Sequence, residues 1–173
     1  MRSKGFEGMA CSIASVLGAI GDRWGALVLR DLHLGLRRFD DLRQSTGITN
    51  ATLSDRLKAL ELNGLIERQQ YQSRPDRFEY VLTPRGQDTE LVVMALAQVG
   101  DKWDLENLGG APLTFINGKT GHAAKLALLD TVTGEPVRMR DIKIEEGPGA
   151  DERIRWRLAK RAEHTGTPKS WPG

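Results

Sequence analysis

The sequence predicts an α+β fold in which short helices surround one β-hairpin. Residues 39–65 hold two short amphipathic segments joined by a tight turn. Residues 65–82 follow with strand composition and, in their second half, an alternation of apolar and polar side chains with a period of two. Glycine turns separate further short apolar runs in the last third of the chain. These observations predict a helical domain with a hairpin, followed by a small β-rich extension.

The two segments of residues 39–65 read as a helix-turn-helix. The first ends near Thr46-Gly47, because glycine readily takes the left-handed conformation that closes a helix. Thr49 supplies an oxygen at the N-cap of the second. Three leucines of that helix recur at the spacing i, i+4, i+7 and share one face: Leu53, Leu57 and Leu60. Any small helical bundle has such faces, so this pattern alone leaves an ordinary bundle open.

A β-hairpin directly after the second helix favours a winged helix-turn-helix. Residues 65–71 and 78–82 are strand-like, and residues 73–77 contain a proline that a central strand would not tolerate. Arg74 and Arg77 flank Pro75, so two cations project from the hairpin tip. A wing of this kind contacts the phosphate backbone of DNA.

The exposed side of the second helix carries small or hydrogen-bonding groups of the kind that enter a DNA major groove. We expect the wing arginines to bind phosphate and the start of the helix to lie near base edges. Between Arg23 and Arg85, eleven basic residues face eight acidic ones, while the whole chain has a net charge of +2. The predicted DNA-contacting residues are Arg38, Thr49, Asn50, Ala51, Thr52, Ser54, Asp55, Arg56, Lys58, Arg74 and Arg77.

Helices on both sides of this region predict a dimer. Thr83-Pro84 is a helix start, and one long helix is expected from there to about Leu105. Its apolar side chains, and those of a helix near residues 11–20, exceed what a small winged domain can bury alone. The expected dimer interface consists of Ile13, Val16, Leu17, Ile20, Leu91, Met94, Ala95 and Leu96.

Seven short phrases, in the same order along the chain, resemble the HxlR-type branch of the MarR-like winged helix-turn-helix regulators. They span Cys11 to about Trp103 and are Cys11-Ser12-Ile13-Ala14, Ile20-Gly21-Asp22-Arg23-Trp24, Leu29-Arg30-Asp31-Leu32, Arg37-Arg38-Phe39-Asp40-Asp41-Leu42, Leu53-Ser54-Asp55-Arg56-Leu57, Asn63-Gly64-Leu65-Ile66-Glu67-Arg68 and Glu79-Tyr80-Val81-Leu82-Thr83-Pro84-Arg85-Gly86. The resemblance implies a homodimer, formed by the first and last helices of the winged domain, that binds double-stranded DNA at a roughly palindromic operator. The winged domain and its dimer helices are expected to occupy residues 1–108.

Residues 109–150 resemble an extension of some relatives in which cysteine turns form a zinc-ribbon-like knuckle. Short strands are expected over residues 115–122, 125–136 and 137–144. Thr120, Asp130 and Thr133 stand where thiolates would be, and hard oxygen ligands do not replace thiolates for structural zinc. We therefore expect the ribbon shape without a metal or other cofactor.

Residues 151–173 form the third predicted segment, a basic helical tail with a loose end. Five basic side chains surround Trp156 in it: Arg153, Arg155, Arg157, Lys160 and Arg161. A solvated helix docked by its tryptophan and a tail that contacts DNA or a partner both remain open.

Catalysis and membrane insertion find little support in the sequence. Neither a nucleophile nor a carboxylate pair lies beside His33, His122 or His164, and no glycine-rich phosphate loop follows a strand. We expect a protein that is not an enzyme. The start, MRSKGFEGMA, lacks the apolar stretch of a signal peptide, and no apolar run approaches the roughly 20 residues of a membrane span. A cytoplasmic location is therefore expected.

Two triggers of regulation stay open. Cys11, the single cysteine, begins a helix, where the positive helix end favours a thiolate and hence a redox or electrophile sensor; an inert buried thiol is the alternative. A small-molecule effector is the other trigger, in a pocket of Trp24, Leu27, Met94 and Trp103 between the dimer helices and the winged core.

A winged-helix protein-interaction module without specific DNA binding is the competing function.

Overall fold

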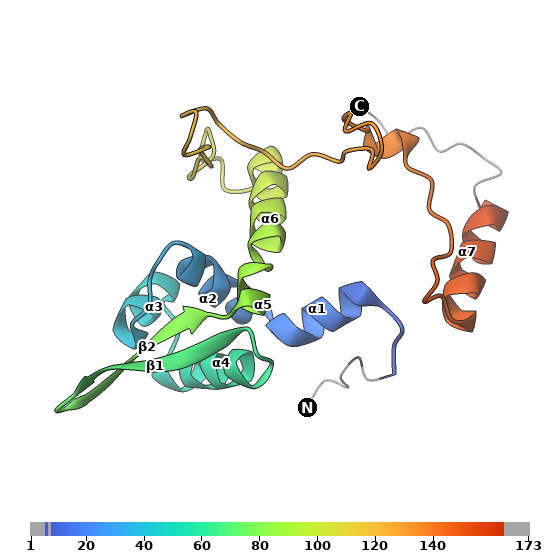
Figure 1. Cartoon of the computed structure of the whole chain (residues 1–173). Coiled ribbons are helices and arrows are strands. Elements are labelled where there is room, and N and C mark those ends of the chain that lie inside the picture. Colours follow the sequence, from blue (N-terminus) through green and yellow to red (C-terminus); the bar gives the residue numbers. More distant parts are fainter. Residues whose placement is uncertain (1–5, 7, 165–173) are drawn as a thin grey trace. The chain divides into compact units, whose positions relative to one another are not determined.

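The computed structural model describes residue 6 and residues 8–164. Contacts between residues divide the chain into two units, Val16–Ala127 and Met1–Ser15 with Leu128–Gly173. Helices and one hairpin make up its regular elements, labelled in Figure 1: α1 Ser12–Ile20, α2 Arg23–His33, α3 Phe39–Thr46, α4 Asn50–Leu62, β1 Ile66–Ser73, β2 Asp76–Leu82, α5 Pro84–Gln87, α6 Glu90–Trp103, the 3-10 helix η1 Met139–Asp141 and α7 Glu152–His164.

The core of the winged unit lies where α2 packs against α3, α4 and α6. Val28 and Leu29 of α2 meet Leu42 of α3 there, and all three are completely buried. The leucines of α4 at positions 53, 57 and 60 join the same cluster, as their spacing predicts. The predicted helix-turn-helix is therefore confirmed as α3 and α4.

The ends of α3 and α4 follow the predicted turn chemistry. Gly47 closes α3 with a φ of 69°, the left-handed conformation that glycine adopts without strain. The Thr49 hydroxyl accepts the backbone N–H of Thr52 at 3.2 Å and so caps α4. Between these two caps, Ile48 packs into the core and anchors the turn.

The β-hairpin follows α4 as predicted. Strands β1 and β2 pair antiparallel from Ile66 opposite Leu82 to Ser73 opposite Asp76, with an irregularity between Gln70 and Gln72. Burial fades along β1, since Ile66 is buried and most residues after it are exposed. The base of the hairpin thus joins the core, while its tip extends outward as a wing toward the lower left of Figure 1.

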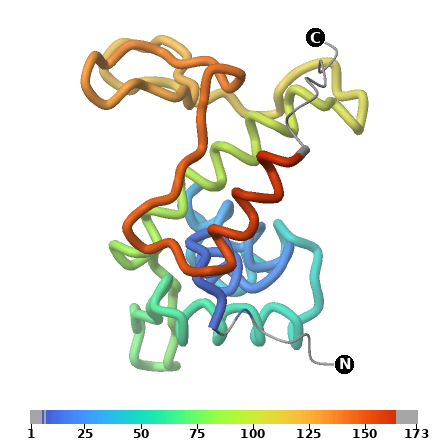
Figure 2. Tube along the Cα trace, turned by 90° about the vertical axis from the view of Figure 1, so that its right-hand side faces the viewer, coloured from blue at the N-terminus to red at the C-terminus, as the bar shows by residue number. Residues whose placement is uncertain are grey.

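The single long helix expected after the wing is divided into α5 and α6, and that prediction was wrong in this detail. Thr89 lies at the break, buried, and its hydroxyl donates to the Gly86 carbonyl oxygen at 2.6 Å. The same hydroxyl lies 3.0 Å from Nε2 of His33 in α2. These contacts hold α6 against α2 at its first turn. Figures 1 and 2 both show α6 running away from the winged core beyond that point.

The strands expected in residues 109–150 are reduced to two isolated bridges, Ile116 with Ala123 and Leu129 with Pro136. Each bridge closes a turn, and the side chain of the first residue in each turn, Asn117 or Asp130, stabilises it by accepting backbone hydrogen bonds. Asn117 Oδ1 accepts the N–H of Lys119 at 2.9 Å, and Asp130 Oδ1 accepts those of Val132 and Thr133 at 2.8 and 3.0 Å.

The two turns share the pattern Asx-x-x-Thr-Gly, in Asn117–Gly121 and Asp130–Gly134. Backbone N–H groups of Thr133 and Val132 lower the pKa of Asp130. Hydrogen bonds from the chain itself therefore hold turns in which the resemblance placed metal-bound thiolates. Within residues 8–164 no group of three or more His, Cys, Asp or Glu side chains has the arrangement to hold a metal ion.

Helix α7 spans Glu152–His164, within the segment predicted as a basic tail, and begins where Asp151 Oδ1 accepts the N–H of Ile154 at 2.8 Å. Predictions for residues 165–173 lie outside the described part of the chain. No single helix in that part is long and apolar enough to cross a membrane; α1 and α2 reach that composition only as a pair bent by 79°.

Candidate nucleic-acid interface

The N-terminal turn of α4 presents its side chains to solvent. Thr49, Asn50 and Ala51 are exposed, and Thr52 is half-buried, with its hydroxyl 3.0 Å from that of Thr49. Further along the helix Asp55 and Lys58 are exposed, whereas Ser54 and Arg56 are half-buried. The helix thus has a leucine face in the core and a polar face that a nucleic acid can reach.

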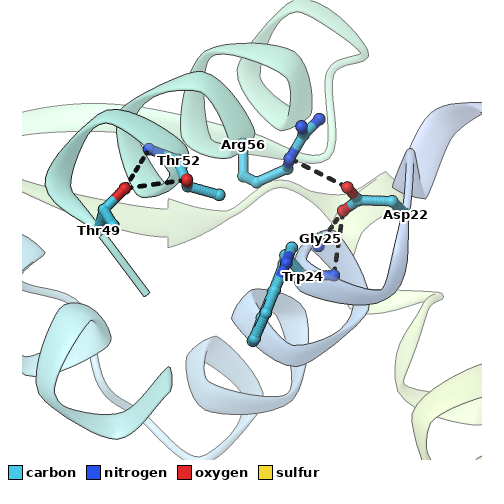
Figure 3. A network of polar contacts seen from close by, with 6 residues as sticks. All are labelled: Asp22, Trp24, Gly25, Thr49, Thr52 and Arg56. Carbon is cyan, nitrogen blue, oxygen red and sulfur yellow. Dashed lines mark hydrogen bonds and ion pairs between the residues drawn. The ribbon is translucent and has the colours of Figure 1, made fainter. Parts of the chain in front are cut away.

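Arg56 is engaged within the protein, as the close view in Figure 3 shows. Its Nε lies 3.3 Å from Oδ2 of Asp22, an ion-pair distance without the alignment of a hydrogen bond. The other oxygen of Asp22 accepts the backbone N–H groups of Trp24 and Gly25 at 3.0 Å each. Asp22 therefore caps α2 and orients the arginine of α4 at once.

Two arginines belong to the wing itself, and a third contacts the wing from the start of α3. Arg74 and Arg77 are exposed at the tip of the wing. Arg38, at the start of α3, places its guanidinium 4.9 Å from the ring centroid of Tyr71 in β1. This cation–π contact ties the start of the helix-turn-helix to the wing. Arg38 and the wing arginines therefore belong to one basic region.

Two contributors to this region are absent from the predicted set. Arg68 stacks on Phe78 at 3.9 Å across the hairpin. The Arg37 carbonyl oxygen accepts the N–H of Tyr80 at 2.8 Å, and its guanidinium lies 3.8 Å from the carboxylate of Glu79. Gln70 pairs with Phe78, and Arg68 lies two residues before Gln70, so the alternation of a strand puts Arg68 and Phe78 on one face of the hairpin. The sequence pattern could therefore have indicated Arg68. It could not have indicated the Arg37 contacts, because they link segments far apart in the sequence.

Only part of the predicted effector pocket is brought together. Leu27 of α2 and Met94 of α6 line one cavity of about 360 Å³, with Phe115 of the following segment. Trp24 instead packs against the core cluster, and Trp103 is 64 % exposed. The cavity wall is completed by Ala26, Arg30, His33, Leu34, Glu90, Val93, Leu96, Ala97 and Leu113.

The predicted dimer residues are mostly exposed in the single chain. Ile13, Leu17 and Leu91 are 72 %, 50 % and 62 % exposed. Val16, Ala95 and Leu96 are exposed as well. Ile20, however, is buried in the core of its own chain, and Met94 is half-buried beside the cavity. The outward stripe is therefore narrower than the sequence pattern suggests.

Cys11 lies immediately before α1. Its carbonyl oxygen accepts the N–H of Ser15 at 3.0 Å, and its side chain is half-buried. It lines a cavity of about 620 Å³ with its neighbours in the N-terminal segment and with Ile154 of α7. The thiol thus sits at a helix start with partial access to solvent.

Comparison with known proteins decides the family. A family described as HxlR-like helix-turn-helix matches residues 19–107, which contain α2 to α6 with the complete wing. The chain belongs to this family. An uncharacterised HTH-type transcriptional regulator of Mycobacterium tuberculosis is 38 % identical over 144 residues, covering 83 % of this chain and 89 % of that protein. YtfH of Escherichia coli, also an HTH-type transcriptional regulator, is 40 % identical over 88 residues, covering 50 % of this chain and 70 % of YtfH.

Solved structures agree with this assignment. PA1374 of Pseudomonas aeruginosa, a candidate transcription factor, is 34 % identical with a TM-score of 0.58 and covers 86 % of this chain and 100 % of its own. The redox regulator HypR in its reduced form is 27 % identical with a TM-score of 0.51, covering 57 % and 98 %. This HxlR-type chain is therefore a DNA-binding winged helix-turn-helix transcriptional regulator and not an enzyme.

Proposed function

We propose that this HxlR-type regulator binds a pseudo-palindromic operator as a homodimer. The N-terminal turn of α4 reads base edges through Asn50 and Thr52, while Arg74 and Arg77 of the wing hold phosphates. The observation that carries this proposal is the exposure of Asn50, Arg74 and Arg77 on the winged unit, with Thr52 half-buried beside Asn50, although α4 buries its leucine face. Polar exposure confined to the open side of a core helix fits a surface kept for a nucleic acid.

A gel-shift titration of DNA from upstream of its own gene tests this proposal. We expect a shift at protein concentrations that leave unrelated DNA of equal length free, with an affinity that falls steeply as salt rises. Binding that shows no salt dependence and no preference would contradict the proposal, and would favour a winged-helix module that contacts other proteins.

The dimer is supported by the unpartnered apolar stripes on α1 and α6. Ile13 and Leu17 repeat at i, i+4 on α1, and Leu91 is exposed on α6. Large exposed aliphatic side chains at helical spacing mark interaction sites in proteins of this size. A two-fold dimer places its two recognition helices about one DNA turn, roughly 34 Å, apart. Such spacing demands an operator of two inverted half-sites.

Regulation is proposed to act through an effector in the cavity beside Leu27 and Met94. Its apolar wall suits a planar or aliphatic molecule of drug size. Since α6 also carries the proposed dimer stripe, a ligand that prefers one setting of α6 shifts DNA affinity, commonly by about 1–3 kcal/mol of coupling. Mass spectrometry of small molecules released from the purified protein, compared with a Leu27→Trp variant that fills the cavity, tests this. A molecule retained equally by both proteins contradicts the site.

Modification of Cys11 is the second proposed trigger. The redox regulator HypR shares the fold, and Cys11 combines a helix start with partial exposure. If Cys11 is the trigger, a cysteine variant loses the response to peroxide. If the ligand in the cavity is the trigger, the variant responds like the wild type.

A further inference from the structure

Helix α7 carries a continuous basic face that the winged domain does not account for. Arg153, Arg157 and Lys160 recur at i, i+4 and i+7, so they lie in one row along the helix. All three side chains are exposed. No acidic residue occurs between positions 153 and 161, a stretch that contains five basic ones.

The net positive charge of the chain is concentrated in this segment. Residues 1–150 contain nineteen basic and twenty acidic side chains, whereas residues 151–173 contain six basic and three acidic. The regulator as a whole is thus nearly neutral without its last segment. Charge in this segment adds to the basic excess between Arg23 and Arg85 and strengthens the long-range attraction of this chain for DNA.

The opposite side of α7 is used for packing. Ile154 and Leu158 are half-buried, and Ile154 lines the cavity shared with residues 9–13 and 15. Arg155 lies on the side of the helix away from the basic row, and its Nε donates to Glu146 at 3.1 Å. The helix is therefore oriented by its apolar side and by this ion pair. Within the row, Lys160 Nζ donates to Glu163 at 2.8 Å and remains exposed, as do Arg153 and Arg157.

Trp156 lies at the border of the basic row. It is three residues after Arg153 and four before Lys160, so it neighbours both on the helix surface, and 62 % of it is exposed. An exposed indole beside cations gives the row an apolar contact for a sugar, in addition to charge for phosphate.

We propose that the α7 row, defined as Arg153, Arg157 and Lys160 with Trp156 at its border, is a second DNA-contacting surface that binds the phosphate backbone without reading sequence. The inference rests on the DNA binding proposed for α4 and the wing. Its occupant is DNA because the row offers three cations and, as its one large exposed apolar side chain, Trp156. A helix that lies in an anionic membrane needs a free apolar face, and the aliphatic residues of α7 are already half-buried.

Salt dependence gives the test its measure. Each lost phosphate contact lowers the slope of log K against log salt by about 0.9, and at 0.15 M salt weakens binding about fivefold. The variant Arg153→Gln/Arg157→Gln/Lys160→Gln keeps good helix formers in α7 and removes three charges. We expect its affinity for operator DNA to fall by about a hundredfold, with the slope reduced and the ratio of operator to unrelated DNA unchanged.

A control with the same loss of charge is available in the same unit. Arg138, Arg140 and Lys143 are exposed and lie outside α7. The variant Arg138→Gln/Arg140→Gln/Lys143→Gln tests whether net charge alone matters. It is expected to lose less than threefold in affinity. Circular dichroism at 222 nm and the melting temperature of both variants verify that α7 and the fold persist.

Three outcomes overturn the inference. Equal losses in the two triple variants would assign the effect to net charge. An unchanged slope in the α7 variant, with normal binding by the wild type, would leave the operator contacts to α4 and the wing alone. If the α7 variant loses the wild type's binding to vesicles of 30 % phosphatidylserine in phosphatidylcholine and keeps its DNA binding, the row would be assigned to a membrane. A wild type that does not bind DNA at all contradicts the proposed function instead.

Discussion

Asp22 and Arg56 join the start of α2 to the middle of the recognition helix through one carboxylate. Oδ2 of Asp22 lies 3.3 Å from Nε of Arg56, while Oδ1 accepts two backbone N–H groups of α2 at 3.0 Å. The cap fixes the carboxylate, and the carboxylate in turn limits where the guanidinium can lie. Arg56 is thereby held near the polar face of α4 before any DNA arrives.

Two substitutions of Asp22 separate its roles. Asp22→Asn keeps an oxygen for the cap and removes the charge, so we expect a loss of less than about 1 kcal/mol in the free energy of unfolding, as for other partly exposed ion pairs. Asp22→Ala also removes the cap and should lose about 1 kcal/mol more. Urea unfolding measures both, with Asp55→Asn on the exposed side of α4 as the control. Equal losses for Asn and Ala would show that the cap contributes nothing.

The wing and the start of α4 should fail in different ways. Replacing Arg74 or Arg77 with alanine removes a phosphate contact, so affinity for every sequence should fall alike, with the salt slope smaller by about 0.9. Replacing Asn50 or Thr52 with alanine should change which operator bases are preferred. Binding to a set of single-base operator variants, titrated at several salt concentrations, distinguishes the two effects. Lys119→Ala, outside the winged helices, provides the charge control. Equal loss of discrimination from both sets would contradict the division of roles.

The fold was predictable where short stretches of sequence decide the structure. The leucine spacing of α4, the cap by Thr49 and the left-handed Gly47 each depend on residues within one or two turns. The pairing of Asp22 with Arg56 joins positions far apart in the sequence, and no local pattern contains it. The same holds for the division of α5 from α6, because His33 of α2 takes part in the contact at Thr89.

The extension shows a different limit of sequence patterns. Its apolar runs have strand composition, yet residues 109–150 form two bridges instead of strands. Asn117 and Asp130 stabilise their turns by bonding to backbone N–H groups two or three residues later. Such Asx turns satisfy the chain locally and need no neighbouring strand. The sequence analysis singled out Asp130 as standing in the place of a thiolate and did not single out Asn117, although the two turns repeat one pattern in the sequence.

If α1 and α6 form the dimer interface, a charged side chain placed on their apolar stripes should dissociate the dimer. Leu17→Glu and Leu91→Glu place a carboxylate on α1 and α6 at positions that are half or more exposed in the single chain, so the fold should persist. An interface that buries them would be disrupted, because an unpaired charge is costly to desolvate. We expect monomers in sedimentation equilibrium and weak operator binding. Leu62→Glu is the control, since Leu62 on α4 is 88 % exposed and lies outside the proposed interface. A wild type that sediments as a monomer at micromolar concentration removes the basis for paired half-sites.

His33 predicts a dependence of stability on pH. Burial lowers its pKa below the ordinary 6.5, an effect that Glu90 partly opposes. The Thr89 hydroxyl donates to Gly86 and therefore accepts from Nε2 of the neutral ring. Below pH 6.5 the unfolded chain takes up a proton that the folded chain resists, so stability is complete above this pH and falls as the pH drops through the folded pKa.

The variant His33→Gln keeps a donor for Thr89 and has no such titration. Its free energy of unfolding should therefore vary less between pH 5 and pH 7 than that of the wild type, in the direction given by proton uptake on unfolding. His122→Gln, at an exposed turn, is the matched control. A wild type whose stability rises as the pH falls through this range would contradict the assignment.

Cys11 decides between the two proposed triggers of regulation. Cys11 directly precedes α1, and its partial exposure gives peroxide access to the thiol. Cys11→Ser is close in size and cannot be oxidised, so operator affinity without peroxide should stay within about twofold of the wild type, as expected for a near-isosteric change. If the thiol is the switch, peroxide lowers the operator affinity of the wild type, a reductant restores it, and the serine variant does not respond. Gel shifts of both proteins with and without peroxide measure this directly. A serine variant that responds like the wild type eliminates the thiol as the trigger, and a ligand in the cavity beside Leu27 and Met94 then remains as the proposed signal.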